Sequence, residues 1–417
     1  MNREKVLLRT KLAQFLMKTV LIGILNWGLG HATRCIPIIK LLEKKGVNII
    51  IASDGIALAL IQTNFPHLKT IELPSYSVQY QSKGSFVFQI AKQIPKLLKA
   101  INEENRFTAT LVAQYKPDLI ISDNRFGFYH TSIPSCFITH QLFLKPKGVL
   151  SLLAPLLNKW NHRFISKFSE VWVPDTEGIN NLSGELSHQR FNSTKRYYIG
   201  WLSQFQVSKS ETESSLRNKY SESHAAIRQE TQNDLSIEVA AILSGPEPQR
   251  TILENILIPQ LADLGKRVLV IRGLPKGFTQ DLQIEEMDYT RIIGVKEISE
   301  VAQNESTSVI FLKDYANREE LTSILMQTKL VIARTGYTTL MDLAILGKKA
   351  LLIPTPGQME QEYLADRLMA NEMFSTMHQN NIDLIKGLEK ANNLSFNYQE
   401  DNNNRLPERI DFYLSHQ

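Results

Sequence analysis

The stretch VIARTGYTTLMDLAILGKKALLIPTPGQMEQEYLA, residues 331–365, alternates between short apolar runs and helical patterns. The apolar runs at 329–334 and 348–354 are typical of strands that are buried on both faces of a sheet. Each run ends in a turn that contains Thr and Gly, and a helical pattern follows at 337–346 and again after Gln358. The stretch therefore predicts parallel strands joined by helices, which is the repeating unit of an open α/β sheet.

The same alternation occurs in the N-terminal half of the chain. Residues 19–25 and 47–53 read as buried strands, and HATRCIPIIKLLEKKG between them reads as a helix that ends at Gly46. Further apolar runs follow in DLIIS, SCFIT and EVWVP, and the second half adds IEVAAILSG, KRVLVIRG and SVIFL. The fold class predicted from these patterns is α/β, with two doubly wound Rossmann-like halves.

A change of composition marks the boundary between the two halves. Residues 203–235 are polar, charged and poor in apolar side chains, which is typical of a linker or an insertion. We expect an N-terminal domain over 18–202 and a C-terminal domain over 236–417, with a return of the C-terminal helical tail to the first domain left open. A chain of 417 residues is long enough for two such cores.

Composition excludes several classes of protein. The net charge of +5 is too small for a dedicated nucleic-acid binder. Cys35 and Cys136 are far apart in apolar runs, so neither a disulfide framework nor a metal cluster is expected, and no cofactor is predicted. No apolar run reaches the roughly 18 residues that a membrane-spanning helix needs. We expect a cytoplasmic protein.

The N-terminus has some features of a secretory signal, because basic residues precede FLMKTVLIGIL. However, the apolar run at 19–25 is short, contains β-branched residues and leads directly into the turn WGLGH. These features favour a first parallel strand.

Three strand-to-helix turns carry residues suited to a polar, anionic ligand. Gly28 and Gly30 precede a helix that starts near His31, where backbone N–H groups and the positive helix end would face a ligand. The alternative is a tight turn with a histidine that caps the helix. The second turn, LSGPEPQRT, offers Ser244, Gly245 and Arg250 to a phosphate, or is a Pro-rich loop with a solvated arginine.

The third turn lies in the opening stretch. Amides at Arg334, Thr335 and Gly336 would hold a diphosphate, and Asp342, six residues further on, would accept hydrogen bonds from ribose hydroxyls. Glu360 and Gln361 open the next helix with groups that suit sugar hydroxyls. Taken singly, Asp342 is also explained as a helix-surface acid and Gln361 as a helix cap.

Residues 331–365 resemble the C-terminal signature of glycosyltransferase family 28, the family of the peptidoglycan N-acetylglucosaminyltransferase. WGLGHATR is similar to the glycine loop of that family, although Trp27 and Leu29 stand where family members commonly have glycine. ILSGPEPQRT and SDNRFGFYH are more similar still to an uncharacterised bacterial branch. The resemblance implies a GT-B fold, in which two Rossmann-like domains face a central cleft.

The resemblance also implies roles for the candidate residues. Thr335 and Gly336 would hold donor phosphate, with Ser244, Gly245 and Arg250 beside it, while Asp342 would hold ribose and Glu360 and Gln361 the donor sugar. A nucleotide-sugar donor, with uridine diphosphate favoured, would give a hexose or N-acetylhexosamine to an unidentified glycan or lipid-linked acceptor, with inversion. The chain has no D-x-D motif, which is typical of metal-dependent transferases of the other main fold, so no metal is expected.

For the general base, His31 is the first candidate because an imidazole titrates near neutrality. Asp123, at the end of DLIIS, is second, and His140 is third, since strand ends are where open α/β sheets place ligands. Two other functions compete: a nucleotide-sugar epimerase of the same architecture, and a non-catalytic nucleotide-sugar binder.

The segment FLKPKGVLSLLAPLLNKWNHRF mixes leucine, tryptophan and basic residues. It is either an interfacial helix that contacts the inner face of the cytoplasmic membrane peripherally, or a core-facing helix with a solvated basic side. The second interpretation is preferred from the sequence.

Overall fold

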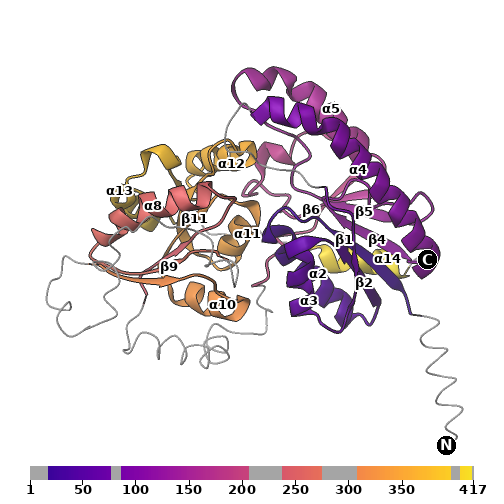
Figure 1. The fold of residues 1–417 in the computed structure, drawn as a ribbon, viewed down its shortest axis with the longest axis horizontal. Helices are drawn as coiled ribbons and strands as arrows, with labels where there is room; N and C mark the ends of the chain where they lie inside the picture. Colours follow the sequence, from indigo (N-terminus) through magenta and orange to yellow (C-terminus); the bar gives the residue numbers. More distant parts are fainter. Residues whose placement is uncertain (1–16, 77–85, 206–236, 275–307, 396–403, 416–417) are drawn as a thin grey trace, which may run out of the picture. The chain divides into compact units, whose positions relative to one another are not determined.

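The computed structural model describes residues 17–76, 86–205, 237–274, 308–395 and 404–415. These residues form two compact units (Figure 1). The first extends to Gln204 and includes the C-terminal helix, and the second begins at Phe205. The polar segment 203–235, predicted as a linker, lies almost entirely outside the described residues.

The first unit is built on a sheet of seven parallel strands in the order β3-β2-β1-β4-β5-β6-β7. The strands are β1 (Thr19–Ile24), β2 (Asn48–Ser53), β3 (Lys69–Glu72), β4 (Leu119–Asp123), β5 (Ser135–Ile138), β6 (Glu170–Val173) and β7 (Lys195–Tyr198). The helices are α2 (Leu29–Lys44), α3 (Gly55–Asn64), α4 (Phe86–Tyr115), α5 (Ala154–Ile165) and α14 (Leu406–Ser415), with short 3-10 helices η1 (Gly148–Leu153) and η2 (Gly184–Leu186).

The position of β1 determines where this unit presents its polar groups. Strand β1 pairs with β2 on one side and β4 on the other, so the order of the strands reverses direction between β1 and β4. Their register places Ile24 beside Asp123 at the carboxyl ends of the two strands. In open α/β sheets a ligand crevice forms at such a switch point.

The C-terminal helix α14 packs on the first unit, as the yellow ribbon near α2 shows (Figure 1). Arg409 of α14 donates a hydrogen bond to the buried Glu170 of β6, and its guanidinium lies 3.8 Å from the ring centroid of Tyr197. The buried Tyr413 lies near Trp172 of the same strand. These contacts join the end of the chain to the first sheet.

The second unit repeats this architecture with six parallel strands in the order β10-β9-β8-β11-β12-β13. The strands are β8 (Val239–Ile242), β9 (Arg267–Ile271), β10 (Val309–Lys313), β11 (Leu330–Arg334), β12 (Lys349–Ile353) and β13 (Ser375–Thr376). The helices are α8 (Gln249–Ala262), α10 (Arg318–Gln327), α11 (Tyr337–Ile345), α12 (Met359–Ala370) and α13 (Leu384–Asn393), with the 3-10 helix η5 (Gln379–Asn381).

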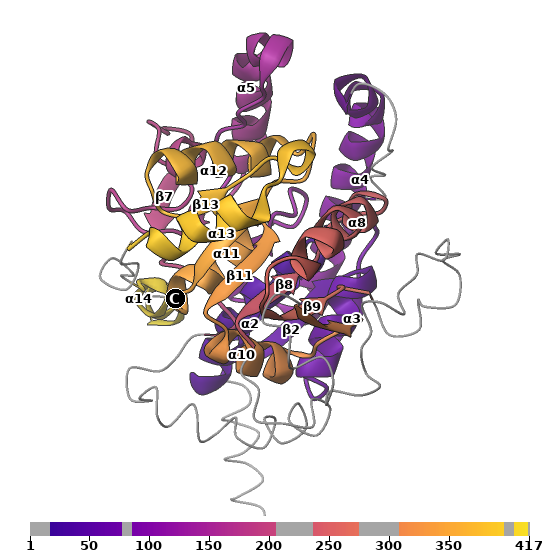
Figure 2. The same cartoon turned by 90° about the vertical axis from the view of Figure 1, so that its left-hand side faces the viewer.

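Helices cover both faces of the second sheet. Apolar side chains of α8 and α13 pack on one face, where these helices lie side by side (Figure 2), and Ile324 of α10 packs on the other. The reversal of strand order here falls between β8 and β11. The predicted fold class, two doubly wound α/β halves, is confirmed.

Among the described residues, no helix has both the length and the apolar character needed to cross a membrane.

Candidate active site

The turn after β1 places His31 in the first turn of α2. Gly28 has a φ of 78°, a left-handed conformation that favours glycine, and α2 begins at the next residue. Arg34 follows His31 by three residues and therefore lies on the same side of the helix. The local sequence thus places an imidazole and a guanidinium side by side on one face of α2.

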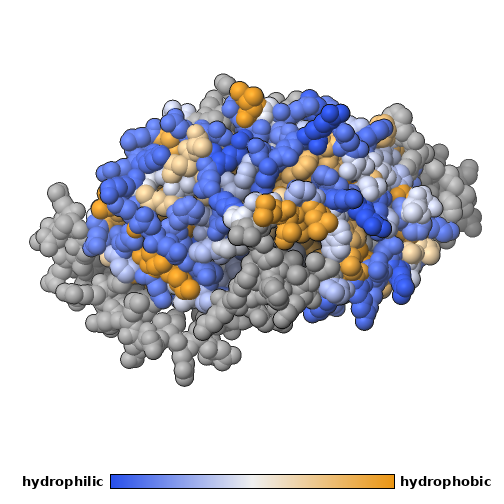
Figure 3. Space-filling view, turned by 90° about the horizontal axis from the view of Figure 1, so that it is seen from above, coloured by the Kyte–Doolittle hydropathy of each residue, from blue (hydrophilic) through white to orange (hydrophobic). Residues whose placement is uncertain are grey.

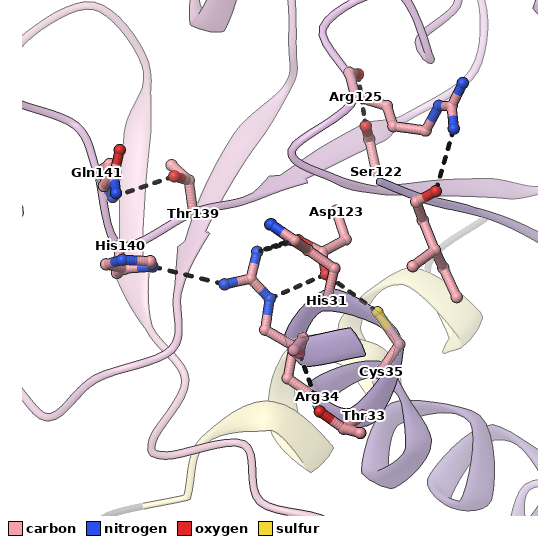
Figure 4. Close-up of polar contacts among 12 residues, drawn as sticks. His31, Thr33, Arg34, Cys35, Ser122, Asp123, Arg125, Thr139, His140 and Gln141 are labelled. Atoms are coloured by element: carbon pink, nitrogen blue, oxygen red, sulfur yellow. Dashed lines mark hydrogen bonds and ion pairs between the residues drawn. The ribbon is translucent and has the colours of Figure 1, made fainter. Parts of the chain in front are cut away.

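The side chains of His31 and Arg34 both contact Asp123, the last residue of β4 (Figure 4). Nδ1 of His31 lies 3.2 Å from Oδ1 of Asp123, and Nε of Arg34 donates to Oδ2 at 2.9 Å. A second N–H of Arg34 donates to Oδ1, and the Cys35 thiol donates to Oδ2 at 3.3 Å. The side chain of Asp123 is fully buried, whereas that of His31 is 14% exposed.

The charges of this cluster keep Asp123 anionic and His31 neutral. Burial alone would raise the pKa of Asp123, but the charge of Arg34, with the contribution of His31, outweighs it and holds that pKa well below its usual range. For His31, burial and then the charge of Arg34 lower the pKa below 6.5, against the opposing effect of Asp123. A neutral imidazole beside a carboxylate is suited to accept a proton.

This geometry gives the three candidate bases different positions. His31 is the one whose ring reaches the surface, and Asp123 lies behind it as its partner. His140, in the loop after β5, is buried, and its Nδ1 lies 3.5 Å from Nη1 of Arg34. Arg34 was not predicted to have a role, although its spacing of three residues from His31 on a predicted helix was a usable signal.

Arg125 belongs to a separate buried network. Its guanidinium donates to Glu104 and, at 2.6 Å, to Asp54. It also donates to the carbonyl oxygens of Ile24 and Pro74. These contacts connect Arg125 to the loops that follow several strands, so Arg125 stabilises the loops of the first unit.

In the second unit, three neighbouring strands end in loops that converge on Gly245. This residue follows β8 and has a φ of 111°. A Cβ atom placed there would lie 3.7 Å from Oγ1 of Thr355, after β12, and 3.9 Å from Nε of Arg334, at the end of β11. Glycine at 245 therefore leaves room beside a hydroxyl and a guanidinium.

Three buried polar atoms at these loops form no hydrogen bond with any described residue: Nε of Arg334, Oγ1 of Thr335 and Oγ1 of Thr355. Arg334 donates to the carbonyl oxygens of Pro354 and Gln249, and makes no ion pair with a described carboxylate. Burial lowers its pKa to about 10. A buried donor without a hydrogen bond and a buried cation without a counter-charge both cost folding free energy, unless a ligand supplies the missing partner. An anion would accept hydrogen bonds from all three atoms and balance the charge of Arg334.

The remaining predicted donor residues lie around the same edge of the sheet. Thr335 and Gly336 precede α11, and Asp342 is buried further along that helix. Gln361 of α12 accepts a hydrogen bond at 2.8 Å from the backbone N–H of Thr355, so it is tied to the loop after β12. Glu360 is its neighbour in the first turn of α12.

Arg250, a candidate for the diphosphate site, is paired within the second unit. Its buried guanidinium donates to Glu247 and Glu254, and also to Oγ1 of Thr251 at 2.7 Å and to the carbonyl oxygen of Arg272 at 3.3 Å. Ser244 lies in the preceding loop and is exposed. Thr355 has no predicted role in the sequence, but its hydroxyl lies beside Gly245, as does the unpaired Nε of Arg334.

The described residues contain no group of three or more His, Cys, Asp or Glu side chains that would hold a metal ion.

Comparison with known proteins connects this geometry to a family. Residues 281–410 match the family described as the glycosyltransferase family 28 C-terminal domain. No curated protein matches the chain in sequence. The matched range includes Arg334, Thr335 and Asp342, and begins after Gly245.

Solved structures share the architecture at low sequence identity. MurG of Acinetobacter baumannii is similar with a TM-score of 0.54 and 11% identity, over 96% of this chain and 100% of that one. The calicheamicin glycosyltransferase CalG4 is similar with a TM-score of 0.58 and 11% identity, over 96% and 99%. UDP-GlcNAc 2-epimerase from Methanocaldococcus jannaschii is similar with a TM-score of 0.53 and 13% identity, over 96% and 100%. The chain therefore has the GT-B fold of these structures, and its residues 281–410 match the C-terminal domain of glycosyltransferase family 28.

Proposed function

We propose that the protein transfers a hexose or N-acetylhexosamine from a nucleoside diphosphate sugar, with uridine diphosphate as the nucleotide, to a hydroxyl group of a glycan or lipid-linked acceptor. The main support for this proposal is that buried polar atoms of Arg334, Thr335 and Thr355 have no hydrogen-bond partner among the described residues. A diphosphate supplies the negative charge and the acceptor oxygens that this set lacks. The N-termini of α8 and α11 at the same edge add positive potential.

Other residues would hold the rest of the donor. Asp342 accepts hydrogen bonds from the ribose hydroxyls, and Glu360 and Gln361 contact the sugar. Gly245 allows the diphosphate to approach the backbone, with Ser244, Gly336 and Arg250 as further members of the proposed site. The proposed reaction needs no metal, because Arg334 and the helix N-termini stabilise the leaving group.

The proposed transfer is a single displacement with inversion. The acceptor oxygen forms a bond to the anomeric carbon while the bond from that carbon to the β-phosphate oxygen breaks. Nε2 of His31 takes the proton of the acceptor hydroxyl, and Asp123 stabilises the resulting imidazolium. The nucleoside diphosphate leaves with the electron pair of the broken bond.

An epimerase is the second candidate, because one of the similar folds is that of UDP-GlcNAc 2-epimerase. The two functions differ in their need for an acceptor. We expect free uridine diphosphate to accumulate from uridine diphosphate N-acetylglucosamine when an acceptor extract is added, and only hydrolysis at background rate without it. Conversion of the donor sugar to its epimer in the absence of acceptor would instead support the epimerase. Binding without either reaction would support a non-catalytic nucleotide-sugar binder.

We also propose a peripheral contact with an anionic membrane surface, at the cytoplasmic face, through η1 and α5. Leu152, Leu153 and Leu156 are 80%, 43% and 62% exposed, so this segment presents three leucines to solvent. Viewed from above, the surface is otherwise mainly hydrophilic, with hydrophobic residues gathered in a few patches (Figure 3).

Charge around this segment favours an anionic surface. Residues 141–169 contain five Lys or Arg residues and no Asp or Glu. Lys159 and Arg163 of α5 line a surface cavity of about 570 Å³ together with Ser166 and Ser193. Each basic residue near an anionic leaflet contributes about 1 kcal/mol of attraction.

We expect the wild type to sediment with vesicles that contain phosphatidylglycerol, and the double variant L152E/L156E to sediment much less. Two added charges would repel the anionic leaflet, and their burial in the acyl boundary is unfavourable. Ile179, which is 91% exposed, provides the control I179E, which should sediment like the wild type. Equal sedimentation of L152E/L156E and the wild type would refute this contact.

A further inference from the structure

Arg34 connects three titratable groups on three different elements of the first unit. It is 2% exposed and extends from α2 towards Asp123 on β4 and His140 after β5, as Figure 4 shows. Nη2 of Arg34 also lies 3.0 Å from Nδ1 of His31. The same nitrogen of the imidazole is therefore within hydrogen-bond distance of a guanidinium and of a carboxylate.

These two contacts of Nδ1 exclude each other. If Nδ1 carries a hydrogen, it donates to Oδ1 of Asp123 at 3.2 Å and leaves a lone pair on Nε2. If Nδ1 carries none, it accepts from Nη2 of Arg34 at 3.0 Å, and the hydrogen lies on Nε2. Only the first tautomer allows Nε2 to take a proton from an acceptor hydroxyl.

We propose that Arg34 is a positioning residue for His31: its guanidinium competes with Asp123 for Nδ1 and thereby sets the tautomer of the imidazole and keeps the ring uncharged. The catalytic meaning of this role rests on the proposed function of His31. The charges that face the ring support it, because Asp123 is already paired with Arg34 by two hydrogen bonds and so attracts a proton on His31 less strongly. The lowered pKa of His31 agrees with this balance.

The arrangement has a consequence for the proton during transfer. A base that formed an unshared pair with Asp123 would hold its proton tightly and release it slowly. With Arg34 on the same carboxylate, the imidazolium formed in the transfer loses part of that stabilisation and returns its proton to solvent more readily. Arg34 thus tunes His31 without touching the reacting atoms.

The tautomer and the pKa of His31 can be measured directly by NMR on protein labelled with ¹⁵N in its histidines, with the signals of His31 assigned from a His31→Gln sample. In Arg34→Gln we expect the pKa of His31 to rise by about one unit or more, a tenfold or larger gain in proton affinity. The share of the Nδ1–H tautomer at neutral pH should increase, because Asp123 then has no competitor for Nδ1. Unchanged tautomer and pKa would overturn the proposal.

Arg125→Gln is the matched control, because Arg125 is also a buried arginine of the first unit and pairs with Asp54 and Glu104 instead. Its loss should leave the His31 signals unchanged. A similar shift in both variants would show that any loss of a buried arginine disturbs the ring, and would refute a specific role of Arg34.

Arg34→Lys decides the question if Arg34→Gln does not fold. Lysine keeps the charge beside Asp123 but has one ammonium group in place of the planar fork, so it cannot hold the carboxylate with two parallel bonds and reach Nδ1 as well. We expect the Nδ1–H tautomer to increase with a smaller change of pKa. A wild-type tautomer in Arg34→Lys would contradict the proposal.

The NMR measurement needs no substrate, so its failure is distinguishable from failure of the proposed function. Where transfer is observed, the acidic limb of the pH profile of kcat/KM should move to higher pH in Arg34→Gln in parallel with the NMR shift. A shift by NMR without any transferase activity would support the positioning role and reject the role of His31 in glycosyl transfer.

Discussion

Replacing His31 by alanine is expected to lower kcat by about 10²–10⁴-fold, the usual contribution of a positioned general base. Nucleotide-sugar binding should be unchanged, because the proposed donor residues lie in the second unit. The wild-type kcat/KM should fall with decreasing pH only below 6.5, since burial and the charge of Arg34 lower the pKa of His31 and keep the ring neutral above it. Steady-state kinetics across pH, with calorimetry for donor affinity, measure both effects.

His67→Ala is the matched control for this experiment. His67 is an exposed histidine of the same unit and contacts a carboxylate, Glu43, as His31 contacts Asp123. Its replacement should leave kcat and its pH dependence unchanged. If His31→Ala retains wild-type kcat, His31 is not the base.

The double variant T335V/T355V should separate ligand affinity from stability. Oγ1 of Thr335 and Oγ1 of Thr355 are buried and unpaired in the protein without ligand, so replacing each hydroxyl by a methyl group should leave the free energy of unfolding unchanged or increase it. Affinity for the nucleotide sugar should fall by about 1–3 kcal/mol, because two hydrogen bonds to the diphosphate are lost. Calorimetric titration and denaturant unfolding give the two quantities.

Thr328→Val is the matched control. Thr328 is equally buried in the second unit, but its hydroxyl donates to the carbonyl oxygen of Ile324 at 2.7 Å. This variant should lose about 0.5–1.5 kcal/mol of stability and keep its ligand affinity. If T335V/T355V loses stability without losing affinity, the two hydroxyls have a structural role and the proposed diphosphate site is wrong.

Most of the fold was predictable because its strands are short apolar runs that are buried on both faces. VIAR, ALLI and LIIS could be recognised without any knowledge of their neighbours. The edge strands β7 (KRYY) and β13 (ST) could not, because they are short and largely polar. Their strand structure depends on pairing with β6 and β12 rather than on their own composition.

The sequence indicated candidate site residues but not how these residues are arranged. His31 and Asp123 were separate candidates for the base, and only the pairing of β1 with β4 brings residues 92 positions apart into contact. Thr355 lay in a Pro-rich turn without periodicity, so nothing in the sequence indicated that its hydroxyl faces Gly245. For Arg250, the i,i+3 and i,i+4 spacings to Glu247 and Glu254 were a usable signal for the pairing that the structure shows.

The central claim is that the second unit binds a nucleoside diphosphate sugar at the loops after β8, β11 and β12. Calorimetric titration tests this claim most directly. Uridine diphosphate, uridine diphosphate N-acetylglucosamine and the thymidine equivalents are titrated into the wild type and into Asp342→Ala. We predict that a nucleotide sugar binds the wild type and binds Asp342→Ala more weakly by about 1–3 kcal/mol, the cost of losing hydrogen bonds to a charged group. Absence of binding of every nucleotide to the wild type, or equal affinity in both proteins, would contradict it.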